Sequence, residues 1–130
     1  MAGELILIVE DNEKNRKLER DILQFHGYRT IESETAEEGI RLAQATPPAL
    51  VLMDIQLPGI NGIEALKELR ADPRTRAIPV IAVTASVMDR DRQKIMAAGF
   101  DGYQAKPIDV TQFVAAVRAA VAGPARGAPP

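Results

Sequence analysis

The sequence predicts an α/β protein with a doubly wound parallel sheet, in which five strands alternate with five helices. Two observations lead to this prediction. Five short segments with strand character recur along the 130-residue chain, and a segment with helical periodicity follows each of them. Three of the short segments are continuously apolar, which is typical of strands buried on both faces. A chain of this length suits one domain with one hydrophobic core.

The first strand is predicted at Leu5–Val9, where LILIV is rich in branched residues and is followed by polar ones. Residues 49–53 (ALVLM) and 79–83 (PVIAV) have the same character and are also predicted to be fully buried strands. Residues 28–32 (YRTIE) alternate more, which favours a strand nearer the sheet edge. Residues 101–105 (DGYQA) are the fifth predicted strand and have the least apolar character.

The first helix is predicted at residues 12–26, where Leu18, Ile22 and Phe25 recur at helical spacing and Gly27 follows as a C-terminal cap. Capping-box patterns mark the starts of three further helices, namely Thr35 with Glu38, Asn61 with Glu64, and Ser86 with Asp89. Apolar stripes mark the buried faces of the third helix (Ile63, Leu66, Leu69) and the last helix (Val110, Phe113, Val114, Val117, Val121), whose predicted N-cap is Asp109.

Composition and charge exclude several classes of function. The 16 basic and 18 acidic side chains give a net charge of −2, so we expect no general attraction to nucleic acid or anionic membranes. The absence of cysteine and the single histidine, His26, exclude disulfides, thiolate chemistry and multi-histidine metal sites. No apolar run could span a bilayer, and residues 1–12 lack a signal-peptide pattern. We therefore expect a soluble, cytoplasmic domain over residues 1–122 and a disordered Pro/Gly/Ala tail over residues 123–130.

Three carboxylates directly follow predicted strands and are expected to meet. Glu10 and Asp11 follow the first strand, and Asp54 follows the third. If the strand order is 2-1-3-4-5, these two strands are neighbours, and their carboxyl ends flank the switch point where such sheets bind ligands. Clustered carboxylates repel one another, and a divalent cation relieves that repulsion. Mg²⁺ fits best, with Asp11, Asp54 and the backbone carbonyl of Gln56 as protein ligands.

Two more strand ends point to the same edge of the sheet, because Thr84 follows the fourth predicted strand and Lys106 the fifth. A metal ion and an ammonium group neutralise phosphoryl oxygens, and a hydroxyl donates one hydrogen bond to them. A carboxylate can attack phosphorus to give an acyl phosphate, and Asp54, central in the set, is the predicted phosphoacceptor. Ala85 is small and would leave room for a phosphodonor. A cis bond between Lys106 and Pro107 would aim the lysine into the site.

Together these residues resemble the receiver domain of response regulators in two-component signalling. The resemblance rests on the acidic pair in VEDN, the aspartate in MDIQLPGINGIE, the threonine in VTAS and the lysine in YQAKP, in that order, and it extends over residues 5–121. It implies a flavodoxin-like (βα)5 fold like that of chemotaxis regulators, with strand order 2-1-3-4-5. It also implies Mg²⁺-dependent transfer of a phosphoryl group to Asp54 from a histidine kinase or a histidine phosphotransfer protein. Within the family, the motifs look most like DivK-type single-domain regulators and the receivers of hybrid histidine kinases.

The resemblance implies a switch as well as an acceptor. Thr84 and Tyr103, the aromatic residue three positions before Lys106, are implied to move together on phosphorylation. Their movement would change the surface that a downstream protein target binds. The protein would be a monomer or a weak dimer, and it would catalyse only its own phosphorylation and dephosphorylation.

One departure from the family pattern concerns Glu10, where an aspartate is more usual. Because glutamate is longer, we expect Glu10 to reach the metal ion through water. The family also implies that the residues two positions after Asp54 and Thr84, here Gln56 and Ser86, tune the lifetime of the phosphoryl group.

Two alternative functions stay open at this point. An aspartyl-phosphate phosphohydrolase needs a second carboxylate as general acid–base, typically two residues after the nucleophile, and that position is Gln56. A phosphorylation-independent interaction module would have no need of the complete set of acidic residues, Thr84 and Lys106. DNA binding is disfavoured because no basic helix-turn-helix segment follows the domain.

Overall fold

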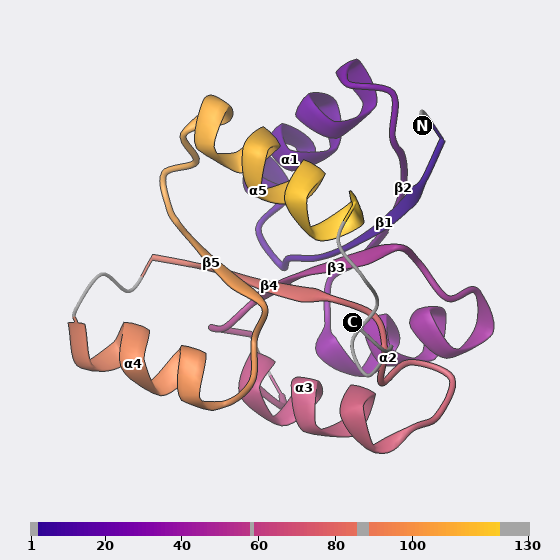
Figure 1. Ribbon diagram of the computed structural model, residues 1–130, viewed down its shortest axis with the longest axis vertical. Helices are drawn as coiled ribbons and strands as arrows, with labels where there is room; N and C mark the ends of the chain where they lie inside the picture. The colour runs from indigo at the N-terminus through magenta and orange to yellow at the C-terminus, as the bar shows by residue number, and fades with distance from the viewer. Residues whose placement is uncertain (1–2, 58, 86–88, 123–130) are drawn as a thin grey trace.

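A computed structural model of the chain describes residues 3–57, 59–85 and 89–122. Within these residues, five strands alternate with five helices (Figure 1). The strands are β1 (Leu5–Val9), β2 (Arg29–Ser33), β3 (Leu50–Asp54), β4 (Val80–Thr84) and β5 (Gly102–Ala105). The helices are α1 (Glu13–Phe25), α2 (Ala36–Ala45), α3 (Gly62–Ala71), α4 (Asp89–Ala97) and α5 (Val110–Ala122). None of the described helices is both long and apolar enough to cross a membrane. The predicted tail lies outside the described residues.

The five strands form one parallel sheet in the order β2-β1-β3-β4-β5, which confirms the predicted fold class and strand order. β2, β3 and β4 each begin and end one residue later than predicted. Backbone pairing continues past the last apolar residue, since Asp54 lies opposite Val83 and Thr84 lies opposite Ala105. Hydrophobicity alone could not reveal this pairing, because both of these terminal residues are polar.

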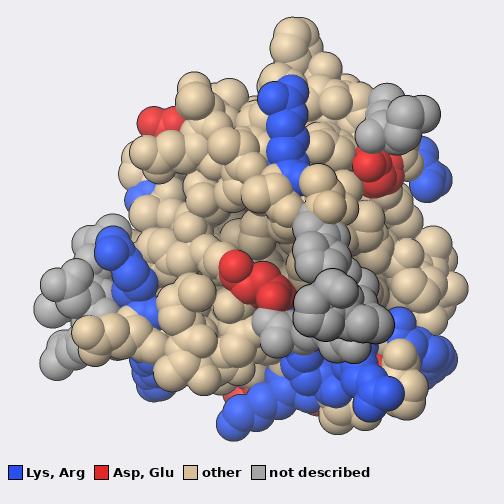
Figure 2. Space-filling model, viewed as in Figure 1, with Lys and Arg blue, Asp and Glu red and all other residues tan. Residues whose placement is uncertain are grey.

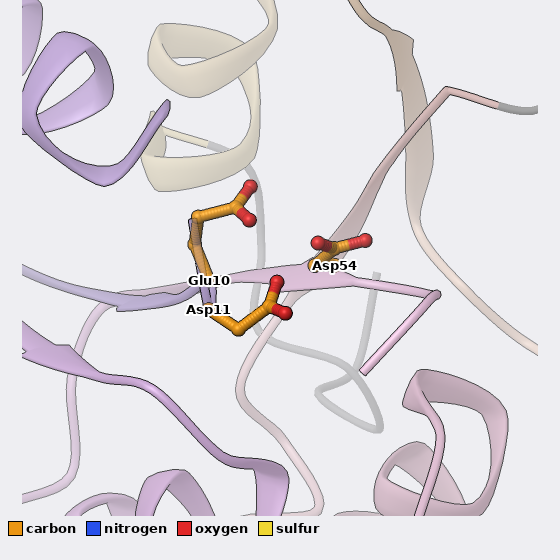
Figure 3. A group of neighbouring side chains, drawn as sticks. All are labelled: Glu10, Asp11 and Asp54. Carbon is orange, nitrogen blue, oxygen red and sulfur yellow. The ribbon is translucent and has the colours of Figure 1, made fainter. Parts of the chain in front are cut away.

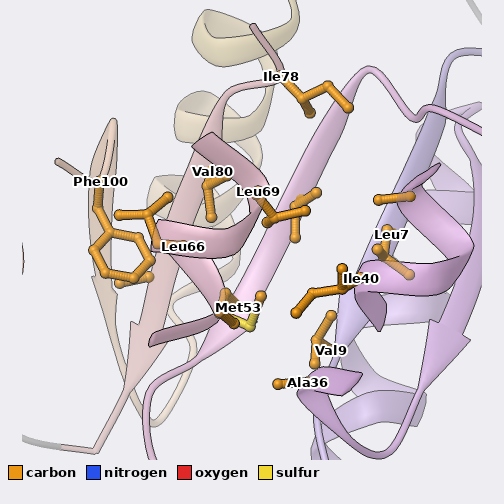
Figure 4. Packing of buried hydrophobic residues seen from close by; sticks show 14 of the residues in the cluster. Leu7, Val9, Ala36, Ile40, Met53, Leu66, Leu69, Ile78, Val80 and Phe100 are labelled. Carbon is orange, nitrogen blue, oxygen red and sulfur yellow. The ribbon is translucent and has the colours of Figure 1, made fainter. Parts of the chain in front are cut away.

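Helices cover both faces of the sheet. α1 and α5 lie on one face, and α2, α3 and α4 lie on the other (Figure 1). Side chains alternate between the faces of a strand. Ile8 and Leu52 therefore pack in the cluster under α1 and α5, whereas Leu7 and Met53 pack in the cluster under the other three helices (Figure 4). Burial on both faces explains why β1, β3 and β4 are continuously apolar.

Side-chain caps begin four of the helices. Asn12, Thr35, Asn61 and Asp109 each accept a hydrogen bond from the backbone N–H three residues later, at 3.0, 3.2, 3.0 and 3.0 Å. The pair of Asn61 and Glu64 forms a full capping box, because the Glu64 carboxylate also accepts a hydrogen bond from the Asn61 backbone N–H. These bonds satisfy backbone donors that have no partner inside the helix. The predicted cap at Ser86 lies outside the described residues.

The buried face of α1 differs from the prediction. Leu18 is 42% exposed and Phe25 is 85% exposed, so the predicted stripe of Leu18, Ile22 and Phe25 is wrong at two of its three positions. The side chains that α1 buries are those of Glu19, Ile22 and Leu23. Both sets have helical spacing, so spacing could not choose between them. In α5, Val110 is likewise 48% exposed, while Phe113, Val114 and Val117 are buried.

Charged side chains are spread unevenly over the surface. Basic side chains gather along the edge of the molecule near α3 in the view of Figure 2. Ion pairs neutralise part of this charge: Arg70 lies 2.8 Å from Asp101, and Arg74 lies 2.8 Å from Asp72. The same arginine, Arg70, donates a hydrogen bond to the backbone oxygen of Ile78, so these contacts also tie α3 to the segment before β4.

Candidate functional site

Asp54 is the last residue of β3, and it is only 4% exposed. It shares a strand face with Leu50 and Leu52, which pack in the cluster under α1 and α5. Its Oδ1 atom accepts a hydrogen bond from the backbone N–H of Gln56 at 3.0 Å. The rigid strand below and this turn above hold the carboxylate at the carboxyl edge of the sheet.

The three predicted acidic residues come together. β1 pairs with β3, which brings Glu10 and Asp11, just past Val9, beside Asp54. One carboxylate oxygen from each of the three residues lies within 4.8 Å of the others, and the side chains converge on one space (Figure 3). Glu10 is 1% exposed, whereas Asp11 is exposed. The group therefore presents one accessible carboxylate beside two buried ones.

Lys106 supplies the positive charge of the site. Its Nζ atom lies 2.7 Å from Oε1 of Glu10 and 3.1 Å from Oδ2 of Asp54. Its backbone N–H donates to the Thr84 carbonyl at 2.9 Å, and the Lys106–Pro107 peptide bond is cis. Burial alone would lower the pKa of Lys106, but the hydrogen bond that its ammonium group donates to Glu10 and the charge of Asp54 outweigh burial and raise it. The lysine is thus held in its charged form.

Glu10 is the least exposed carboxylate of the group. Burial raises its pKa from 4.5 to about 7, and the hydrogen bond with Lys106 opposes that rise. Its Oε2 atom accepts a hydrogen bond from the Asn12 backbone N–H at 3.1 Å, and its backbone carbonyl accepts one from Arg16 at 2.9 Å. With Oε1 next to Lys106, both carboxylate oxygens of Glu10 already have neighbours of positive character.

Thr84 and Ala85 lie on the other side of Asp54. Thr84 is the last residue of β4 and is fully buried, while Ala85 is exposed. Thr84 also lines a polar pocket of about 230 Å³, together with Gln56 from the loop after β3 and Lys94 from α4. The threonine therefore lies between the acidic group and an open polar space.

Tyr103 lies on β5, opposite Ala82 of β4, and is half-buried. Its ring packs against the cluster under α2, α3 and α4. Lys106 and Thr84 belong to the same edge of the sheet, since Thr84 pairs with Ala105. The structure thus brings the acidic residues, Lys106 and Thr84 to one edge of the sheet. Tyr103 lies on β5, two residues before Ala105, which ends the strand at this edge.

Sequence reasoning missed Glu19. This α1 carboxyl is 1% exposed, and its Oε2 atom has no hydrogen-bond partner among the described residues. Burial, reinforced by the negative charge of Glu10, raises its pKa from 4.5 to about 8. The available signal was its spacing of three and four residues from Ile22 and Leu23. Because a glutamate is usually solvent-exposed, its position in line with Ile22 and Leu23 did not by itself predict that it is buried.

The arrangement has a definite chemical capacity. Three carboxylates and one ammonium group leave the site with an excess of acidic groups, which favours a cation with oxygen ligands. The buried carboxylate of Asp54 is oriented by a backbone N–H and paired with a lysine, so it can act as a nucleophile toward an electrophile that the lysine also contacts. A phosphoryl group meets both conditions.

Known proteins resemble this chain in sequence and structure. A family model described as the response regulator receiver domain matches residues 6–118. The polar-differentiation response regulator DivK of Brucella ovis is 45% identical over 113 residues, which cover 87% of this chain and 92% of DivK. These matches agree with the resemblance carried by the four sequence motifs.

Two solved structures of similar proteins are informative. The receiver domain of the sensor histidine kinase PA1611 from Pseudomonas aeruginosa is 32% identical with a TM-score of 0.87, and the alignment covers 94% of this chain and 100% of that one. That crystal structure has a magnesium ion coordinated in the active-site cleft. The receiver domain of a signal transduction histidine kinase from Syntrophus aciditrophicus is 29% identical with a TM-score of 0.85, covering 93% of this chain and 92% of that one.

Proposed function

Since this chain belongs to the receiver domains of two-component response regulators, we propose that Asp54 accepts a phosphoryl group from the phosphohistidine of a histidine kinase or a histidine phosphotransfer protein. An oxygen of the Asp54 carboxylate attacks phosphorus. The bond between phosphorus and the donor's imidazole nitrogen breaks, and its electron pair stays on that nitrogen. The observation that supports this proposal best is the buried Asp54 carboxylate, 3.1 Å from Lys106 and beside two further carboxylates.

We propose Mg²⁺ as the cofactor. Asp11 and Asp54 would bind the ion directly, together with the backbone carbonyl of Gln56, and Glu10 would contact it through water. The convergence of three carboxylate oxygens within 4.8 Å supports this ligand set. Glu10 is given the indirect role because its side chain is longer than that of aspartate, and its carboxylate lies against Lys106 and the Asn12 backbone N–H. When bound, the ion neutralises oxygens of the phosphoryl group and of the surrounding carboxylates.

The remaining residues of the site would hold the transferred group. Lys106 would move its ammonium contact from the Asp54 carboxylate to a phosphoryl oxygen, and the Thr84 hydroxyl would donate a hydrogen bond to another. The small side chain of Ala85 would leave space for the donor. This assignment is supported by the common sheet edge that Thr84, Ala85 and Lys106 share with Asp54.

Phosphorylation would then act as a switch in the cytoplasm. The bound phosphoryl group would draw Thr84 inward, and Tyr103 would turn into the space that Thr84 leaves. A preference of a few kcal/mol for the switched conformation suffices to change its population substantially. The altered surface of α4, β5 and α5 would be the one that a downstream protein target binds, with the chain acting as a monomer or weak dimer.

The family is one of phosphoacceptor switches, and we propose that this chain catalyses only its own phosphorylation and dephosphorylation. A phosphohydrolase with an aspartyl-phosphate intermediate typically has a carboxylate as general acid–base two residues after the nucleophile, and Gln56 at that position argues against this alternative. Turnover of a small phosphomonoester would contradict this part of the proposal.

Phosphodonor labelling tests the assignment of Asp54. We expect incubation with acetyl phosphate and Mg²⁺ to add one phosphoryl group, detected by intact mass, and peptide mapping to locate it at Asp54. Asp54→Asn should abolish the modification. Asp21→Asn, which removes an exposed carboxylate of α1, should leave it unchanged and serves as the matched control. Modification at another residue, or full modification of Asp54→Asn, would refute the assignment.

A further inference from the structure

Arg92 of α4 contacts the aromatic ring of Tyr103. The guanidinium carbon lies 5.5 Å from the ring centroid, which is within the range of a cation–π interaction. Arg92 is exposed and Tyr103 is half-buried, so the ring lies between the apolar cluster beneath it and a charged side chain. α4 runs along the sheet edge that β5 forms (Figure 1).

A guanidinium group is well suited to this position. Its planar, delocalised charge stacks on aromatic faces, and it is less strongly hydrated than an ammonium group. The contact exists only while the ring stays between α4 and β5. A ring turned toward Thr84 would lose it.

We propose that Arg92 is a positioning residue that holds Tyr103 at the surface between α4 and β5 and so opposes the inward turn of the ring. The consequence for switching rests on the proposed function, whereas the restraint on the ring does not. A cation–π contact at an exposed site would bias the two ring positions about two- to fivefold. Arg92 would therefore set how much of the protein is switched at a given level of phosphorylation.

The place of Arg92 in α4 links this restraint to the phosphorylation site. Asp91 and Lys94, on either side of Arg92 in sequence, line the polar pocket beside Thr84. Ile95, one helical turn after Arg92, lines the same pocket. A movement of α4 that follows Thr84 would therefore carry Arg92 with it. Release of the Tyr103 ring and displacement of α4 would then be parts of one transition.

Fluorine NMR can observe the ring directly. The chain has two tyrosines, so Tyr28→Phe leaves Tyr103 as the single site for 3-fluorotyrosine labelling. The resonance of the untreated protein and its position after acetyl phosphate and Mg²⁺ define the two reference states. In the untreated protein, we expect Arg92→Gln to move the resonance toward the phosphorylated position, and Arg92→Lys, which keeps a cation, to move it less.

A charge-matched control separates the contact from a general loss of positive charge. Arg41→Gln removes an exposed arginine from α2 and should leave the Tyr103 resonance unchanged. Arg92→Gln should also lower the acetyl phosphate concentration for half-maximal displacement about two- to fivefold. An Arg92→Gln resonance identical to that of the parent protein would overturn the proposal, and so would equal displacement by Arg41→Gln.

The outcomes also distinguish this inference from the proposed function. If acetyl phosphate leaves the parent resonance unchanged, the phosphorylation switch fails. A displaced resonance in untreated Arg92→Gln, with none in Arg41→Gln, would still support the restraint. A parent protein that responds to acetyl phosphate while Arg92→Gln does not differ from it would refute the restraint and leave the switch intact.

Discussion

Lys106 places one positive charge between two buried carboxylates, 2.7 Å from Glu10 and 3.1 Å from Asp54. Removal of one partner of a buried ion pair leaves an uncompensated charge, which costs more free energy than the pair itself contributes. Burial already raises the pKa of Glu10 to about 7, and Lys106 opposes that rise. Without the lysine, the pKa of Glu10 would rise further, and ionised Glu10 would destabilise the folded state.

We therefore expect Lys106→Met to lower the free energy of unfolding by roughly 2 to 4 kcal/mol at pH 8, and by less at pH 5, where protonated Glu10 needs no cationic partner. Urea unfolding followed by circular dichroism at the two pH values measures the difference. Lys17→Met removes an exposed lysine paired with exposed Asp21 and should cost less than about 1 kcal/mol. Equal losses for Lys106→Met at pH 5 and pH 8 would contradict the prediction.

At the scale of elements, hydrophobic periodicity located the strands and helices because burial on one or two faces leaves a regular trace in the sequence. The topology then brought Glu10, Asp11, Asp54 and Lys106 together, since parallel strands end at one edge of the sheet. These are the parts of the fold and site that sequence reasoning could predict. The strand ends at Asp54 and Thr84 could not be predicted in this way, because backbone pairing does not depend on hydrophobicity.

The sequence also could not predict features that depend on the rotation of a helix about its axis. The stripes through Leu18 and through Glu19 both have helical spacing, and only packing on the sheet selects the second. The contact between Arg92 and Tyr103 depends in the same way on how α4 lies against β5. Side-chain spacing constrains which residues share a face, but it leaves open which face is buried.

The start of α3 lies very close to the end of β3, and Gly62 makes this possible. A Cβ atom at Gly62 would lie 2.7 Å from the backbone oxygen of Asp54 and 3.0 Å from the Cα of Ile55. Backbone atoms cannot give way as a flexible side chain does. We expect Gly62→Ala to displace α3 from the phosphoacceptor, to lower stability by roughly 1 to 3 kcal/mol and to slow phosphorylation by acetyl phosphate.

Gly102→Ala is the matched control for this element. A Cβ atom there would lie 3.4 Å from a side-chain carbon of Ile81, so the change should alter stability by less than about 1 kcal/mol and leave the phosphorylation rate unchanged. Thermal unfolding and mass-resolved time courses compare the two variants. If Gly62→Ala matches Gly102→Ala in both measurements, the close approach of α3 to β3 is not needed for stability or for phosphorylation.

At the scale of the whole molecule, the acidic site connects metal binding to stability. The Glu10, Asp11 and Asp54 oxygens are gathered within 4.8 Å only in the folded state, so a cation bound there stabilises folding by mass action. At 100 times its dissociation constant, Mg²⁺ should add about 2.7 kcal/mol to the free energy of unfolding. Asp11→Asn should remove most of this gain in thermal unfolding at constant ionic strength. Asp21→Asn should retain it, and an unchanged gain in Asp11→Asn would refute the ligand assignment.

Glu19 makes the stability of the whole molecule depend on pH. Burial, reinforced by the negative charge of Glu10, raises its pKa to about 8 in the folded protein, whereas the ordinary value is 4.5. Between these two values the unfolded chain has released the Glu19 proton and the folded chain still holds it. The folded state binds more protons, so the contribution of Glu19 to stability is greatest at low pH and is lost as the pH rises through this window.

A neutral isostere isolates this contribution. Glu19→Gln cannot ionise, so we expect it to match the wild-type protein in stability near pH 5 and to exceed it by roughly 2 to 4 kcal/mol near pH 9. Glu68→Gln removes an exposed carboxylate from α3 and should leave the pH dependence unchanged. Urea unfolding across this pH range gives the two curves. Parallel curves for wild type and Glu19→Gln would mean that Glu19 is ionised in the folded state. Curves that diverge with rising pH would mean that this buried carboxyl holds its proton at neutral pH, close to the residues that receive the phosphoryl group.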